Sequence, residues 1–108
     1  MAQDFENVKA RNIGTSASTL LTANSDDALI GIRVANVVAQ TIQVDVFISS
    51  GGSDYHLAKG VSIPQGSSME FIDGGAKVVV QSGDVIKVVS DTASSCDVWV
   101  SAVDAIST

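Results

Sequence analysis

The sequence predicts an all-β fold, and composition and periodicity carry that prediction. Val and Ile together fill 25 of the 108 positions, whereas Leu fills four. β-Branched side chains are stiff at χ1, which suits a pleated strand and disfavours a helix. Most of these residues alternate with polar ones, and no segment keeps a helical period over three turns. Turn signals recur at about 8–12 residues, so we expect one antiparallel, jelly-roll-like β-sandwich of about eight strands.

Two central segments carry the clearest strand pattern. In the ranges 28–37 and 41–49, Ile and Val recur at every second position, as they do on the inward face of a half-buried strand. Because the connection between them is short, we expect the two segments to pair as an antiparallel hairpin. Their inward positions, together with two from the last strand, define the predicted core: Ile30, Ile32, Val34, Ile42, Val44, Val46, Ile48, Val98 and Val100.

Turn chemistry places the other strands. The Gly pairs at 51–52 and 74–75 are interpreted as turn glycines, because neither precedes a helix or fits a phosphate-binding loop. The segments 77–81 and 85–90 are expected to form a second hairpin around Gly83. Further strands are expected at 19–22, at 55–63 with a bulge near Lys59-Gly60, at 67–72 and at 97–104.

Length and cysteine content suggest one domain that needs no disulfide. A chain of 108 residues is close to the usual domain size, so we expect a single β-sandwich domain over 1–108, with residues 1–17 as an N-terminal arm or edge strand. The polar, acidic N-terminus does not resemble a secretory signal, and no apolar run reaches the roughly 20 residues of a membrane-spanning helix. Cys96, the single cysteine, is expected to be a free thiol in a Ser-rich loop. We therefore expect synthesis in a cytoplasm.

The charge balance disfavours two classes of partner. Twelve Asp and Glu residues face six Lys and Arg residues, for a formal net charge of -6. Binding to nucleic acid needs clustered cations, whereas the cations here are scattered along the sequence. Anionic membranes are disfavoured for the same reason. We expect no nucleic-acid and no membrane partner.

Residues with catalytic or metal-binding chemistry do not fall into a recognisable pattern. The segment Ser53–His56 holds the residue types of a hydrolase, but adjacent residues of a strand point to opposite faces. Asp26, Asp27, Asp73 and Asp84 offer oxygens for Ca²⁺, although they lack EF-hand spacing and Asp is common in turns. We expect no catalytic residue, no metal and no cofactor, with calcium as the less favoured alternative.

Outward apolar residues suggest an interaction surface instead. If Val46 and Val100 face the core, the neighbouring Phe47 and Trp99 point outward. An exposed apolar patch on a small domain usually marks a partner surface, although a second sheet or the N-terminal segment would be an alternative cover. The candidate interface residues are Phe5, Val8, Phe47, Trp99 and Val103.

Several stretches resemble one group of known proteins. They are NIGTSAST at 12–19, VAN at 34–36 before TIQVDV at 41–46, and the series YHLAK at 55–59, IPQGSS at 63–68 and QSGDVIKV at 81–88. Together they resemble small β-sandwich virion structural proteins of tailed bacteriophages, notably marine and cyanobacterial ones.

The resemblance implies a non-enzymatic virion protein: a capsid decoration, neck or tail component that is made and assembled in the host cytoplasm. It also implies contacts with other virion proteins and with copies of itself, as a homotrimer or another symmetric oligomer. It supplies no catalytic residues. The main alternative is a carbohydrate-binding, lectin-like module that binds a host receptor, since β-sandwiches often bind sugars. A small hydrolase is disfavoured. The fold by itself does not distinguish among these functions.

Overall fold

The described part of the chain forms nine β-strands. The computed structural model describes residues 4–72 and 78–104, and within these ranges it contains no helix, hence none long and apolar enough to cross a membrane. The strands are β1 (Asp4–Ile13), β2 (Ser18–Thr22), β3 (Asp27–Asn36), β4 (Ile42–Ser50), β5 (Ser53–Ile63), β6 (Ser68–Glu70), β7 (Val78–Val80), β8 (Val85–Ser90) and β9 (Cys96–Asp104).

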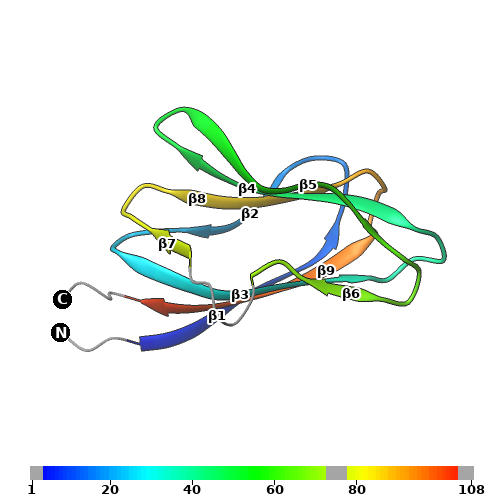
Figure 1. Ribbon diagram of the computed structural model, residues 1–108, viewed down its shortest axis with the longest axis horizontal. Helices are drawn as coiled ribbons and strands as arrows, with labels where there is room; N and C mark the ends of the chain where they lie inside the picture. Colours follow the sequence, from blue (N-terminus) through cyan, green and yellow to red (C-terminus); the bar gives the residue numbers. More distant parts are fainter. Residues whose placement is uncertain (1–3, 73–77, 105–108) are drawn as a thin grey trace.

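The strands are arranged in two antiparallel sheets that pack face to face (Figure 1). One sheet has the order β1-β9-β3-β6, with β7 also paired to β3, and the other has the order β2-β8-β4-β5. β6 pairs with Arg33–Ala35 and β7 with Asp27–Leu29, so the two short strands lie along opposite halves of β3. If they are counted as one interrupted strand, the chain changes sheets at every connection except the one from β4 to β5. That is the connectivity of a jelly roll, and it confirms the predicted all-β sandwich and its strand number.

Two predicted hairpins are wrong. β3 and β4 lie in different sheets, and so do β7 and β8. The alternation within a strand indicates which of its residues are buried, but it does not indicate which strand lies beside it. A short connection between two strands fits a hairpin as well as a corner between sheets.

The true hairpin joins β4 to β5. Ser50 pairs with Ser53, and Gly51 and Gly52 between them have φ values of 59° and 86°. Positive φ at both central residues is the requirement of a type I′ turn, which glycine meets without strain. The bulge expected near Lys59-Gly60 is confirmed, since the register of this hairpin shifts there and Gly60 has a φ of 63°.

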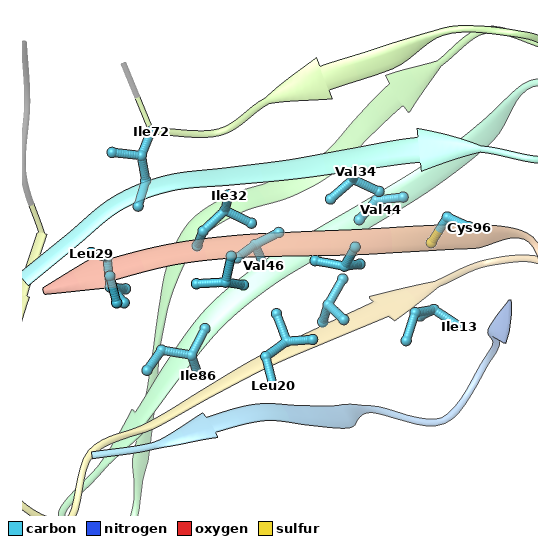
Figure 2. Packing of buried hydrophobic residues seen from close by; sticks show 14 of the residues in the cluster. Ile13, Leu20, Leu29, Ile32, Val34, Val44, Val46, Ile72, Ile86 and Cys96 are labelled. Carbon is cyan, nitrogen blue, oxygen red and sulfur yellow. The ribbon is translucent and has the colours of Figure 1, made fainter. Parts of the chain in front are cut away.

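The core lies between the two sheets (Figure 2). Of the nine predicted core residues, seven are buried and Ile48 is partly buried against the same cluster. The seven are Ile32, Val34, Ile42, Val44, Val46, Val98 and Val100. Burial of a side chain of this size contributes about 1.5–3 kcal/mol, so the cluster is the main source of stability.

Ile30 is the exception among the predicted core residues. The β3–β9 register shifts between Leu29 and Gly31, where a β-bulge interrupts the pairing. The extra residue moves Leu29 into the core and leaves Ile30 only partly buried. Its assignment to the core is therefore wrong, because strict period-2 alternation fails at a bulge.

β1 is an edge strand. β1 pairs with β9 from Asp4↔Asp104 to Ile13↔Cys96, and its other side is free of strand partners among the described residues. Ile13 reaches the core after a register shift that follows Ala10. The assignment of 1–108 to one domain stays a prediction.

Cys96 begins β9 rather than lying in a loop, and its side chain is buried in the core as a free thiol. Burial raises the pKa of this thiol from 9.0 to about 11. We expect the native thiol to be inert to a disulfide reagent at pH 8 and to react fully in denaturant. The pKa of Cys96 is higher in the folded state than in the unfolded state. Burial of the neutral thiol therefore contributes its full stability below pH 9, and this contribution declines as the pH rises toward 11. A rapid reaction of the native protein at pH 8 would contradict this placement.

Candidate functional site

The outer face of the β1-β9-β3 sheet centres on Trp99. The strand registers align Lys9, Trp99 and Arg33 side by side on β1, β9 and β3. The Lys9 ammonium lies 5.0 Å from the centroid of the Trp99 ring, which is a cation–π distance. On the far side, Arg33 Nη2 lies 3.7 Å from Glu70 Oε1 of β6. These residues come from four strands that are distant in sequence, and the sheet brings them into one row.

Two shallow hollows flank the Trp99 ring. The first has a volume of about 370 Å³, and its polar side chains are Lys9, Arg11, Arg33 and Asp97. The second has a volume of about 310 Å³, and it is lined by Phe5, Glu6, Asn7, Ile30, Trp99, Ser101 and Ala102. Trp99 lines both, so its half-exposed ring is the ridge between two depressions, and the surface suits a protruding partner better than a flat one.

Three of the predicted interface residues lie on this face. Phe5 is 82 % exposed, Trp99 is 49 % exposed, and Val103 is half-buried opposite Phe5 in the register. Val79 of β7, at 59 % exposed, pairs with Ala28 of β3 on the same sheet. Their part in an interface stays a prediction, but the structure does bring them to one sheet.

The other two predicted interface residues are not exposed as expected. Val8 pairs with Val100 and is partly buried against the core, since it alternates with the outward residues of β1. Phe47 is only 8 % exposed, because its ring lies against His56 of β5 with the ring centroids 5.0 Å apart. The prediction that Phe47 presents an exposed ring is therefore wrong, and a cross-strand neighbour is the reason.

The chain also offers a second exposed apolar site that sequence reasoning did not single out. Tyr55 and Leu57 of β5 are 61 % and 38 % exposed. β5 is an edge strand that pairs with β4 alone among the described strands. The signal was present as apolar residues in a strand pattern, but the sequence gives no means to tell an edge strand from a central one.

The residues considered for chemistry do not assemble into a reactive group within residues 4–72 and 78–104. His56 lies against Phe47, and the Asp54 carboxylate accepts a hydrogen bond from the Ser49 hydroxyl. Asp84 accepts from the Ser50 hydroxyl and the Gln81 amide, and these bonds lower its pKa. No group of three potential metal ligands occurs in the described ranges, and Asp73 lies outside them.

Comparison with known proteins supports the fold. No family model and no curated protein matches the chain. Among solved structures, a chain in the structure of infectious bursal disease virus, Gx strain, is similar over all of this chain, with a TM-score of 0.57 and 12 % sequence identity. This chain covers 34 % of that viral chain, about a third of its length. At this identity the similarity shows a shared β-fold and no more.

Proposed function

We propose that this protein is a non-enzymatic structural component of a virus particle and that it acts through contacts with copies of itself and with other virion proteins. The observation that carries the proposal is the outer face around Trp99, where exposed apolar side chains and two hollows lie on a domain whose core is already filled. The jelly-roll topology and the viral structural neighbour support it, since jelly rolls are common in viral capsids.

The finer assignment rests on the resemblance in sequence. Tailed bacteriophages, and a place as capsid decoration, neck or tail component, are suggested by the motifs at 12–19, 34–46 and 55–88. The matched virus is not a tailed bacteriophage, so the phage part of the proposal has no support from the structural comparison. The expectation of a trimer also rests on this resemblance in sequence.

Sedimentation of the purified chain tests the proposal. At micromolar concentration we expect a symmetric oligomer, and we expect Trp99→Asp to shift it toward monomer, because a carboxylate at the centre of the face opposes its desolvation. Thr19→Asp puts the same charge on an exposed position of β2 in the other sheet and should leave the oligomer intact. A wild-type monomer at all concentrations would contradict self-association, and an oligomer untouched by Trp99→Asp would remove this face from it.

One observation favours a carbohydrate-binding module as the second candidate. A half-exposed tryptophan beside Lys9, Arg33 and Asp97 combines a stacking surface with polar groups, which is the combination that sugar rings use. A glycan array separates the two functions. Binding that is lost in Trp99→Ala but kept in Tyr55→Ala would favour the module, whereas the virion proposal predicts no glycan binding.

A further inference from the structure

We propose that the hollow between Trp99 and Arg11 receives the Asp54–Leu57 edge of β5 from a second copy of the chain. The inference deepens the self-association part of the proposed function and rests on it. The contact is head-to-tail: each copy binds one neighbour through its hollow and another neighbour through its β5 edge.

The first surface carries unbalanced positive charge. Three of the six Lys and Arg residues of this acidic chain line the hollow. Arg33 is paired with Glu70, whereas Lys9 donates to the neutral Asn7 amide oxygen at 2.9 Å. Among the described residues, Arg11 has neither an ion pair nor a hydrogen bond. Two cations without a carboxylate partner thus border the Trp99 ring.

One carboxylate, that of Asp97, lines the hollow beside these two cations, and the rest of the lining is apolar. Asp97 accepts a hydrogen bond from the Asn12 amide at 3.2 Å, and the small apolar residues are Ala10, Ala35 and Val98. Because Arg33 is paired with Glu70, Lys9 and Arg11 leave the hollow with a net positive charge. The complementary group is therefore a carboxylate next to an aromatic or aliphatic side chain, because the carboxylate pairs with the cations while the apolar group covers Trp99.

The face does not complement itself. In a twofold contact whose axis passes through the hollow, Lys9, Arg11 and Arg33 of one copy would lie near the same cations of the other, and like charges across an interface are unfavourable. A complementary surface elsewhere on the chain avoids this repulsion. Outside this sheet, the large exposed apolar residues of the described ranges are Val37, Tyr55 and Leu57.

β5 carries both the carboxylate and the apolar side chains that would complement the hollow. Asp54 precedes Tyr55 and Leu57 on this strand. Its carboxylate accepts a hydrogen bond from the Ser49 hydroxyl and has no ion-pair partner among the described residues. Because neighbouring residues of a strand point to opposite faces, the edge presents the Asp54 carboxylate on one side and the Tyr55 ring on the other, which suits entry between Arg11 and Trp99. The outer edge of β5 has no strand partner in the described part of the chain, so its backbone is open to a neighbour. Val37 lacks an adjacent carboxylate, which leaves β5 as the matching segment.

The two surfaces lie on opposite sides of the sandwich. Figure 1 shows β5 along the upper sheet, whereas β1 and β9 lie in the lower one. A contact between different surfaces is heterologous, so repetition closes a ring when the rotation permits and otherwise continues.

A charge exchange between the two surfaces tests the inference. Arg11→Glu and Asp54→Arg should each weaken self-association by roughly fivefold to tenfold at low salt, measured by sedimentation, because each change places like charges in contact. The double variant Arg11→Glu with Asp54→Arg should regain most of the affinity. Arg11→Glu with Asp26→Arg introduces the same charges without the proposed contact and should stay weak.

The outcomes separate this inference from the proposed function. Arg11 and Asp54 are exposed, so thermal unfolding of each variant should match that of the wild type and confirm that folding is intact. An oligomer that ignores the single changes, or whose affinity the double variant fails to restore, would overturn the Arg11–β5 contact and leave self-association standing. A monomeric wild type would overturn both.

Discussion

Truncation of Ile32 to alanine is expected to lower the free energy of unfolding by about 2–4 kcal/mol. Ile32 is fully buried in the middle of β3, between the two sheets (Figure 2). Alanine removes three buried carbon atoms and leaves a cavity that a packed sandwich fills only in part. Urea unfolding monitored by circular dichroism measures the change.

Ile30→Ala is the matched control for this prediction. It is the same change in the same strand, two residues earlier, at the β-bulge where the side chain is only partly buried. We expect a loss of less than about 1.5 kcal/mol, because partly exposed groups leave no closed cavity. Equal losses at the two positions would show that β3 keeps strict alternation and that the bulge is misplaced.

Replacement of Asn36 by alanine is expected to cost about 2–4 kcal/mol, although the side chain is polar. Asn36 is buried at the end of β3, and its amide nitrogen donates to the carbonyl oxygens of Gln40 at 2.7 Å and Ile63 at 2.9 Å. Its amide oxygen accepts from the Val38 amide at 2.9 Å. The side chain therefore holds the corner between the sheets to the end of β5, and its loss leaves three backbone groups without their partner.

Two further variants isolate the hydrogen bonds of Asn36. Gln40→Ala keeps the backbone carbonyl that Asn36 uses and should cost less than about 1 kcal/mol. Asn36→Asp keeps the shape of the side chain but replaces the amide nitrogen, which donates to two carbonyl oxygens, with an oxygen that accepts. We therefore expect it to be at least as destabilising as Asn36→Ala. An Asn36→Asp variant as stable as the wild type at neutral pH would contradict the bonding scheme.

Much of the fold was predictable because strand periodicity is a local property. Seven predicted core residues alternate along β3, β4 and β9 and are buried as expected, and Gly60 marks its bulge through the chemistry of glycine. The pairing of strands was not predictable in the same way. β3 and β4 are adjacent in sequence yet lie in different sheets, because the short connection between them turns a corner held by a side chain, Asn36.

The candidate surface was predictable only in part. Alternation about Val100 places Trp99 on the outer face, and the structure agrees. It does not reveal that Lys9 and Arg33 flank the ring, because that row depends on the registers of β1 and β3 against β9. Phe47 fails for a related reason: the burial of its ring depends on His56 in the neighbouring strand.

The most direct test of the account uses Trp99, the single tryptophan of the chain, as its own reporter. In the free chain its ring is half-exposed, so an acrylamide quencher should reach it readily. As the protein concentration rises through the range in which sedimentation detects assembly, we expect the emission to shift to shorter wavelength and the quenching to fall, because the partner covers the ring. Assembly without any change in the emission or quenching of Trp99 would contradict the claim that copies meet at this face.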